Sequence, residues 1–321
     1  MQERFFNILN QRFGKKLVLD TMMEHFMLKK GAAYKRMNGT SILSVSELNF
    51  LADHFNVSLD TMLQRESFLS FQHPFMDTSK VDFLEQYAYY LKPLSRSKGS
   101  KLIYMANEIP VFYYFSHQHI FNFLTHIWEY IHLDSPTLRI PAKTDNIKAL
   151  EELRNEVENH YTNHEVTEIW NSNMLSNLYQ QISFAITIRA FENLDTIDKI
   201  IMDLKDLINN LMQKATKGQQ NENPDSKINV YLNEFGNYLN LVYFNSEKFS
   251  TSFIGLDIPH FIMSHSESFN TFAHAWLQKI MKRSILISGA GYQFRELFFI
   301  KMEKDFSDFV EKVDKLTAVY Y

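Results

Sequence analysis

The apolar residues between Leu17 and Leu63 recur at spacings typical of short helices. They fall three or four residues apart in three groups: Leu19, Met22, Met23 and Phe26; Ala33 and Met37; Leu48, Leu51, Ala52 and Phe55. Spacing of this kind places the apolar residues of each group on one face of a helix. The segment therefore predicts three short amphipathic helices, preceded by a further helix from Arg4 to Phe13.

The first two of the three helices are separated by a short turn, Met27 to Lys30, so the second helix has to leave the first at a steep angle. This is the geometry of a helix-turn-helix. The second helix, roughly Lys30 to Asn38, has a small apolar side and ends at Gly39, a residue that commonly terminates helices. Its outward side carries cationic and hydrogen-bonding side chains, which suit insertion into a major groove. These side chains are Lys30, Tyr34, Lys35, Arg36 and Asn38.

The run KKGAAYKRMNG, followed by LSVSELNFLADHFNVSLDTML, resembles the lambda-repressor-like (XRE-type) helix-turn-helix. In that family a recognition helix ending in Gly precedes a helix of the form SLEELxxLAxxxxVSLDxL. The positions that match the second pattern are Leu43, Leu48, Leu51, Ala52, Phe55, Val57, Leu59 and Leu63. GAAYKRMNG is also similar to the recognition helices of bacterial regulators that carry SAAYRRIRG. The resemblance covers roughly residues 1 to 65 and implies a DNA-binding domain.

The sequence departs from the family pattern at two positions. Met27 stands in the turn where the family usually has Gly, which puts the conformation of the turn in question. Lys29 stands where the recognition helix usually begins on Ser or Thr. A side-chain N-cap of that kind typically stabilises a helix by about 1 kcal/mol, and this chain lacks it.

Positive charge is concentrated at the N-terminal end of a chain whose net charge is −4. Residues 1 to 40 contain three acidic side chains, Glu3, Asp20 and Glu24. The basic ones are Arg4, Arg12, Lys15, Lys16, Lys29, Lys30, Lys35 and Arg36. A basic end on an acidic protein attracts DNA phosphates without making the whole surface adhesive.

We predict that double-stranded DNA is the partner of this region. Lys30, Tyr34, Lys35 and Asn38 are expected at base edges, and Lys15, Lys16, Lys29 and Arg36 at phosphates. An alternative stays open, in which the helices form a protein-interaction or scaffold module and the basic face is simply solvated.

Composition excludes several classes of protein. The chain has no Cys, which excludes disulfides and thiolate metal sites. Its 321 residues are 45% hydrophobic and 15% aromatic, so most of the length can form a core. We find no signal peptide and no run of about 18 apolar residues, and therefore expect a cytoplasmic protein without a membrane segment.

The remainder of the chain predicts a larger, helix-dominated α+β domain, so that the protein as a whole is mainly α. We place the helix-turn-helix domain at residues 1–66, a linker with Pro74 at 67–78, and the α+β domain at 79–321. Helical periodicity covers seven segments of the last: Val81 to Leu91, Ile120 to Ile131, Asn146 to His160, Leu175 to Ala190, Leu194 to Lys214, the stretch after Ser266, and Tyr292 to Leu316.

Strand patterns are fewer and predict only a small antiparallel sheet. Leu102 to Met105 and Val111 to Phe115 read as two short strands. The segments INVYLNE, YLNLVYFN and FSTSFIGL alternate and are bounded by turns, which predicts a three-stranded antiparallel meander. One helix carries a heptad-like seam of Ile197, Ile201, Leu204, Ile208 and Leu211. We favour an intramolecular helix pair for this seam over a dimerisation face.

Candidate chemistry is sparse. His160 and His164 are spaced to hold zinc on one helical face, with Glu168 a further turn along, but exposed polar helix residues explain the pattern better. His117 and His119 suit a loop or a helix start. The segment Ser288-Gly289-Ala290-Gly291 has Phe294 at the third glycine position of a dinucleotide loop, so we expect Ser288 to cap the last helix instead.

Without a catalytic pattern we predict no enzyme activity, no cofactor and no metal. The aromatic residues are explained by core packing, with an apolar ligand pocket as the alternative. They are Phe112, Tyr113, Tyr114, Trp128, Trp170, Tyr243, Phe244 and Trp276. The expected protein is a one-component transcription regulator that binds DNA as a homodimer. Its C-terminal domain is expected to sense a ligand, to dimerise, or both, and a small apolar effector is the ligand that an aromatic pocket would take.

Overall fold

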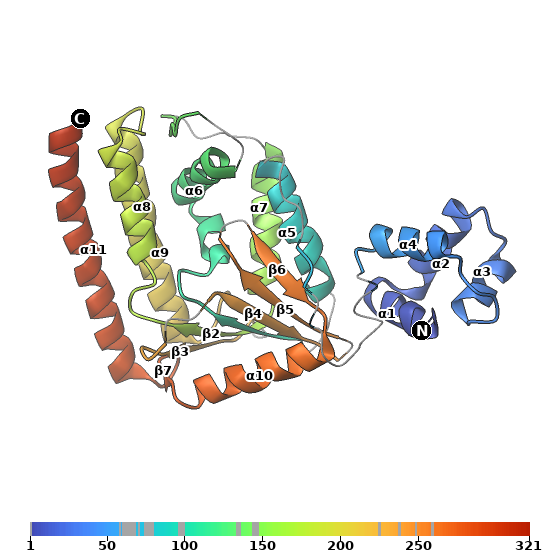
Figure 1. The fold of residues 1–321 in the computed structure, drawn as a ribbon. Helices are drawn as coiled ribbons and strands as arrows, with labels where there is room; N and C mark the ends of the chain where they lie inside the picture. The colour runs from blue at the N-terminus through green and yellow to red at the C-terminus, as the bar shows by residue number, and fades with distance from the viewer. Residues whose placement is uncertain are drawn as a thin grey trace.

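The computed structural model describes most of the 321 residues. The described residues are 2–57, 59, 69, 71–73, 80–95, 100–132, 136–142, 148–223, 226–236, 239–247, 249–257 and 260–321. Most of the predicted linker, with Pro74, and the predicted domain boundary at residue 66 lie outside them. The described residues form three hydrophobic clusters. One lies in residues 2–57, which we call the helical domain, and a large and a small one lie in residues 80–321, which we call the sheet domain (Figure 1).

The helical domain consists of four short helices packed around one core. They are α1 (Gln2–Phe13), α2 (Lys15–His25), α3 (Lys30–Met37) and α4 (Val45–His54). Each helix turns a narrow apolar face inward, and the fully buried residues include Phe5, Leu9, Val18, Met22, Ala33 and Leu51. The helices predicted from apolar spacing are therefore confirmed in number and order.

Strands of the sheet domain form one mixed sheet, which is larger than the antiparallel sheet predicted. In the part of the chain that the structure describes, the strands are β1 (Lys101–Met105), β2 (Glu165–Trp170), β3 (Ile228–Leu232), β4 (Leu241–Asn245), β5 (Ser250–Gly255), β6 (Phe261–Ser264) and β7 (Ile285–Leu286). Their order is β6-β5-β4-β1-β2-β3-β7. Strands β1, β2 and β3 are parallel, and the neighbours outside them are antiparallel.

Helices cover the two faces of the sheet unequally. One face packs against α5 (Lys80–Ser95), the 3-10 helix η1 (Val111–Ser116), α6 (Gln118–His132), α7 (Lys148–Thr162), α8 (Ser176–Thr187), α9 (Leu194–Lys217) and α11 (Tyr292–Tyr320). The other face packs against α10 (Glu267–Met281) (Figure 1). Parallel strands need such crossover helices, because a tight turn cannot return the chain to the same end of the sheet. No helix of the described residues is long and apolar enough to cross a membrane.

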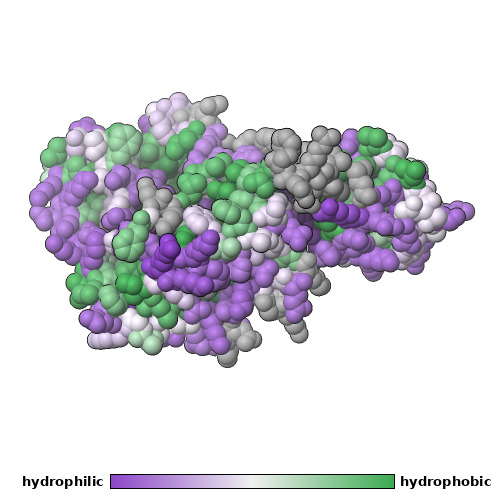
Figure 2. All heavy atoms as spheres, turned by 60° about the horizontal axis from the view of Figure 1, so that its bottom comes forward, coloured by the Kyte–Doolittle hydropathy of each residue, from purple (hydrophilic) through white to green (hydrophobic). Residues whose placement is uncertain are grey.

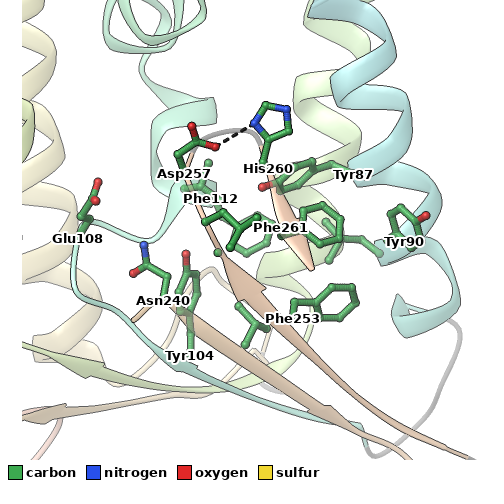
Figure 3. A pocket seen from close by; sticks show the side chains of 15 residues that line it. Tyr87, Tyr90, Tyr104, Glu108, Phe112, Asn240, Phe253, Asp257, His260 and Phe261 are labelled. Atoms are coloured by element: carbon green, nitrogen blue, oxygen red, sulfur yellow. Dashed lines mark hydrogen bonds and ion pairs between the residues drawn. The ribbon is translucent and has the colours of Figure 1, made fainter. Parts of the chain in front are cut away.

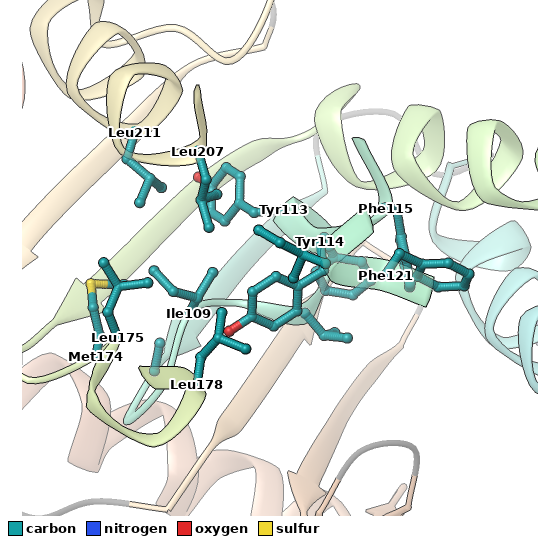
Figure 4. Close-up of a cluster of buried hydrophobic side chains, with 14 of the residues drawn as sticks. Ile109, Tyr113, Tyr114, Phe115, Phe121, Met174, Leu175, Leu178, Leu207 and Leu211 are labelled. Carbon is teal, nitrogen blue, oxygen red and sulfur yellow. The ribbon is translucent and has the colours of Figure 1, made fainter. Parts of the chain in front are cut away.

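The strand predictions were partly wrong. Val111 to Phe115 forms η1 instead of a strand, and its side chains are buried on all sides (Figure 4). INVYLNE does not join a meander, because β3 pairs with β2 in parallel while β4 and β5 form the expected antiparallel pair. Strand β2 was not predicted: the helix expected to end at His160 is α7, which ends at Thr162, and β2 begins at Glu165 directly after it.

The long helices α9 and α11 both contribute side chains to the main core. The seam of α9 is an intramolecular contact: Ile197, Leu204, Ile208 and Leu211 are buried in the main core, against neighbours that include α6 and α11. In α11, Phe298, Met302 and Phe309 face inward, whereas Phe294 and Leu297 are exposed. The inward face of α11 also includes Phe299 and Arg295.

Most of the aromatic residues considered for a pocket belong to the core instead. Tyr113, Tyr114, Trp128, Trp170 and Phe244 are buried with the main cluster, part of which is drawn in Figure 4. Tyr243 and Trp276 belong to the smaller core under α10. Phe112 alone among the eight also lines the cavity described below, where we place the pocket.

Candidate DNA interface and ligand pocket

Helix α3 lies at the end of the helical domain that is farthest from the sheet domain (Figure 1). It buries Ala33 and Met37 and leaves Lys30, Lys35 and Asn38 exposed. Tyr34 is half-buried against the core, and the Lys15 ammonium lies 5.2 Å from its ring centroid. The structure therefore brings Lys15 of α2 and Tyr34 of α3 together, and leaves Lys30, Lys35 and Asn38 accessible on α3 and directly after it. Hydrophilic side chains cover much of this end of the molecule in Figure 2.

The first turn of α3 places two cations at the end of the helix that already carries partial positive charge. Lys29 occupies the N-cap position without a side-chain cap, Lys30 begins the helix, and no acidic residue lies in the first turn. This arrangement disfavours the isolated helix, because the helix dipole favours anions at its N-terminus. It suits a phosphate group, which would accept hydrogen bonds from the first backbone N–H groups of α3 and pair with the lysines.

The turn between α2 and α3 is strained at the position where the resembled family has glycine. Met27 has a φ of 51°, in the left-handed region, and its side chain is 93% exposed. A side chain with a Cβ adopts this conformation only at an energetic cost. The turn therefore keeps its shape without the residue best suited to it, and the exposed Met27 side chain makes little compensating packing.

The loop that follows α3 is fixed by the Gln2 side chain. Gln2 donates hydrogen bonds from Nε2 to the backbone oxygens of Arg36 (2.6 Å) and Ser41 (2.7 Å) and accepts one at Oε1 from the Leu43 N–H (3.0 Å). Gly39 has a φ of 75°, as expected for a residue that ends a helix. The orientation of α3 thus depends on α1 as well as on the turn before it.

Arg36 is held by a partner within the domain. Its Nε lies 3.0 Å from Glu47 Oε1 in α4, and the Glu47 carboxylate also takes part in a capping box with Ser44. Partial burial raises the pKa of Glu47, but hydrogen bonds from Ser44 and Arg36 outweigh it and lower that pKa. Arg36 is therefore less available to a phosphate than Lys15, Lys16, Lys29 and Lys30, which are exposed.

The other groups singled out in the sequence have structural partners. His160 pairs with Glu156 at 3.3 Å and His164 Nδ1 lies 2.9 Å from Ser100 Oγ, so each of the two histidines has a partner of its own. Neither is Ser288 a helix cap: its Oγ accepts a hydrogen bond from Val230 N–H in β3, and Gly291 occupies the N-cap of α11. A Cβ at Gly291 would lie 2.1 Å from Leu286 O, which explains that glycine without a ligand.

His117 and His119 lie where α6 begins, as the sequence suggested. His117 Nδ1 lies 2.7 Å from the backbone oxygen of Tyr113, and the His119 backbone N–H donates to Asp203 (2.7 Å).

A cavity opens at the carboxyl end of β1, where the chain leaves the sheet. Its walls come from α5 (Tyr87 and Tyr90), from the segment after β1 (Phe112), and from β5 and β6 (Phe253 and Phe261) (Figure 3). The empty space is about 800 Å³, a volume that includes solvent at the open mouth. Ligands of α/β proteins commonly bind outside the carboxyl ends of parallel strands, because the chain diverges there. The aromatic walls suit a flat apolar molecule.

Polar groups lie around the rim of the cavity. Glu108, Asn240, Asp257 and His260 are among the lining residues, and His260 Nδ1 lies 2.9 Å from Asp257 Oδ1 (Figure 3). Burial, followed by the nearby Asp257 carboxylate, raises the pKa of Tyr87 well above its ordinary value. A bound molecule would therefore meet apolar rings inside and hydrogen-bonding groups at the mouth.

Tyr90 connects this cavity to the helical domain. Its ring lines the cavity, and its hydroxyl accepts a hydrogen bond of 2.7 Å from Asn56 Nδ2, just after α4. The same residue lines a second cleft, between the domains, together with Arg12 and His265. Burial there lowers the pKa of Arg12 to about 10, and the pKa of His265 falls well below its usual value because of burial and, next, the Arg12 charge.

Comparisons with known proteins give no relative of this chain. No family model, no curated protein and no solved structure matches it.

Proposed function

We propose that this chain is a sequence-specific, double-stranded-DNA-binding regulator in which α2 and α3 form a helix-turn-helix. The observation that carries the proposal is the exposure of α3 at the far end of the helical domain, with Lys30, Lys35 and Asn38 outward. A recognition helix has to project in this way in order to enter a major groove.

The electrostatics of α3 support the same function. Lys29 and Lys30 lie at the N-terminus of α3, where their positive charges destabilise the helix. A phosphate bound there would pair with both lysines, and the two charges would then stabilise the helix. Lys15 and Lys16 extend the positive surface from the first turn of α2. Local arrangements that disfavour the fold without an internal compensation are expected at functional sites.

The complex we propose contains two copies of the chain. One eight-residue helix reaches only a few base edges, whereas two related helices can read half-sites about 34 Å apart, one helical turn of DNA. The aromatic cavity in the sheet domain would take a small apolar effector. Tyr90 offers a physical link, because it touches the cavity and accepts the hydrogen bond from Asn56 of the helical domain.

The decisive experiment measures the salt dependence of DNA affinity. Fluorescence anisotropy with fragments selected from random-sequence duplex DNA gives the slope of log affinity against log salt concentration. Each phosphate contact contributes about 0.9 to the magnitude of this slope, so Lys30→Ala together with Lys35→Ala should reduce it by up to about 1.8 if both lysines reach phosphates, and should relax sequence preference if they reach bases.

The matched control removes two exposed lysines from the sheet domain. Lys199→Ala with Lys205→Ala changes the net charge equally, but both residues lie on α9, away from the helical domain. We expect DNA affinity and slope to stay at the wild-type values. No DNA retention by the wild-type protein at low salt would instead favour the alternative, a protein-interaction module.

A further inference from the structure

A second cluster of chemically active side chains lies at the mouth of the cavity. His132 is the last residue of α6, and Asp257 and His260 lie in the connection from β5 to β6. Each offers one ligand atom, and the three atoms lie within 4.8 Å of one another. Among the described residues, this is the set of histidine and carboxylate groups that meets the spacing of a metal site.

The separations between these atoms agree with a shared ion. Asp257 Oδ2 lies 3.2 Å from His132 Nε2, and Asp257 Oδ1 lies 2.9 Å from His260 Nδ1. Zinc holds nitrogen and oxygen ligands at about 2.0–2.1 Å, so two ligand atoms at a tetrahedral angle are roughly 3.3 Å apart. The two histidines face different oxygens of Asp257, so small side-chain adjustments would bring both nitrogens and one or both carboxylate oxygens onto one centre.

The environment of His132, Asp257 and His260 also suits metal ligands. His132 Nε2 is inaccessible to solvent and makes no hydrogen bond of good geometry, although it faces the Asp257 carboxylate. The imidazole rings of His132 and His260 are 4.3 Å apart at 76° to each other, an arrangement that lets two nitrogens converge without stacking. Asp257 remains half-exposed, which leaves a path from solvent to the centre.

We propose that His132, Asp257 and His260 bind one divalent first-row transition-metal ion, with its open coordination positions at the mouth of the aromatic cavity. Two imidazoles and one carboxylate suit zinc and its neighbours, such as Co²⁺ and Ni²⁺, and are poor ligands for Mg²⁺. Coordination through His260 Nδ1 requires the imidazole tautomer that carries its N–H on Nε2, so the contact between His260 Nδ1 and Asp257 Oδ1 would be replaced by two bonds to the ion.

The proposal does not depend on DNA binding. It extends the chemistry of the cavity, because a bound ion would hold a ligand that has an oxygen or nitrogen donor at one end and an apolar body at the other. Asp257 and His260 are themselves lining residues of that cavity.

The experiment titrates full-length, chelator-treated protein with Co²⁺ and follows the visible ligand-field absorption, then repeats the titration with Zn²⁺ by calorimetry. We expect one equivalent of metal per chain and displacement of Co²⁺ by Zn²⁺. His132→Ala, His260→Ala and the isosteric Asp257→Asn should each weaken binding about tenfold or more, a loss at least as large as that for removing an outer-shell partner.

The matched control is His160→Ala, which removes another histidine paired with a carboxylate, that of Glu156 on α7. Affinity for Co²⁺ should not change in this variant. The proposal is overturned if the wild-type protein shows no ligand-field absorption. The proposal is also overturned if the His132→Ala, His260→Ala double variant binds Co²⁺ as tightly as the wild type. Far-ultraviolet circular dichroism checks that this variant is folded. DNA binding is measured separately, so failure of either proposal leaves the other standing.

Discussion

The helical domain and the sheet domain differ in the range of the contacts that hold them together. The core of the first joins residues between Phe5 and Val57. The centre of the second joins Lys101 to Glu165 on one side and to Asn245 on the other, across a long stretch of sequence. In the helical domain, the residues that break local rules are at the surface, at Met27 and Lys29. In the sheet domain, two of the most costly polar groups are buried, at Glu168 and His164.

This difference predicts where each domain tolerates change. A surface residue that disfavours its own helix can be replaced with a gain in stability and a loss of function. A buried polar group with several partners cannot be removed without leaving those partners unsatisfied. Substitutions at Glu168, His164, Met27 and Lys29 test that contrast.

The largest effect is expected at Glu168, which is fully buried in β2. Its carboxylate accepts hydrogen bonds from Tyr113 (2.8 Å), Tyr161 (2.6 Å) and the Trp170 indole (2.6 Å). Burial outweighs these bonds and raises its pKa. Glu168→Ala leaves three buried donors without an acceptor and creates a cavity, so we expect the free energy of unfolding to fall by about 3 to 5 kcal/mol.

Urea denaturation followed by tryptophan fluorescence measures this loss, because all three Trp residues, Trp128, Trp170 and Trp276, lie in the sheet domain. Glu165→Ala is the matched control in the same strand, since Glu165 pairs with Lys101 at the surface and should cost less than about 1 kcal/mol. Equal losses in the two variants would contradict the role we assign to the buried network.

The structure of the helical domain could be predicted from the sequence more completely than that of the sheet domain. The helices of the helical domain, including α3 from Lys30 and its end at Gly39, follow from apolar spacing and turn residues, which are local signals. The α-helices of the sheet domain were also predicted from the sequence. The order of the strands was not, because β1 pairs with β2 and β4 through contacts that no local pattern encodes.

Some features of the candidate sites were predictable and others were not. Exposed lysines at α3 could be foreseen from the charge distribution. Arg36 could not be assigned to Glu47, since the pair joins two helices. The cluster of His132, Asp257 and His260 comes from α6 and the β5–β6 connection, so only the folded chain brings it together, whereas spacing alone had pointed to His160 and His164.

The second prediction concerns pH and His164. Burial, followed by the nearby His160, lowers the pKa of His164 from 6.5 to about 4. Between these two values the unfolded chain binds more protons than the folded chain. His164 therefore causes no loss of stability above pH 6.5. As the pH falls from 6.5 toward 4, its protonation in the unfolded chain lowers the free energy of unfolding by up to about 3 kcal/mol.

Urea denaturation at several pH values, again followed by tryptophan fluorescence, tests this sign. His164→Leu should flatten the loss of stability between pH 6.5 and 4 relative to wild type. Ser100→Ala removes the hydrogen bond to His164 Nδ1 but keeps the imidazole, so it should lower stability at every pH and leave the slope unchanged. A His164→Leu protein with the wild-type slope would contradict the assignment.

The third prediction is a gain of stability at Met27. Glycine adopts the left-handed conformation of this turn without the cost that a Cβ imposes, although it also gives the unfolded chain more freedom. We expect Met27→Gly to stabilise the turn between α2 and α3 by about 1 kcal/mol. Hydrogen exchange of peptides covering residues 15–40, in the full chain, should slow by about fivefold. Met27→Ala loses the same exposed side chain but keeps the Cβ, so its exchange should not slow.

The smallest effect on stability, and the sharpest contrast between stability and function, is expected at Lys29. Its backbone is already extended, with φ −70° and ψ 147°, much like that of Ser44, which caps α4. Lys29→Ser supplies a cap and removes a cation from the positive end of α3, which should stabilise the helix by about 0.5 to 1 kcal/mol in the same exchange experiment.

If Lys29 contacts a phosphate, the slope of log DNA affinity against log salt should fall in magnitude by about 0.9 in the Lys29→Ser protein. Lys16→Ser removes an equal charge from the first turn of α2 without creating a cap for α3, so it should weaken DNA binding without slowing exchange in the first turn of α3. A Lys29→Ser protein that is more stable and binds DNA as tightly as wild type would show that the charge at the start of α3 serves neither the fold nor DNA.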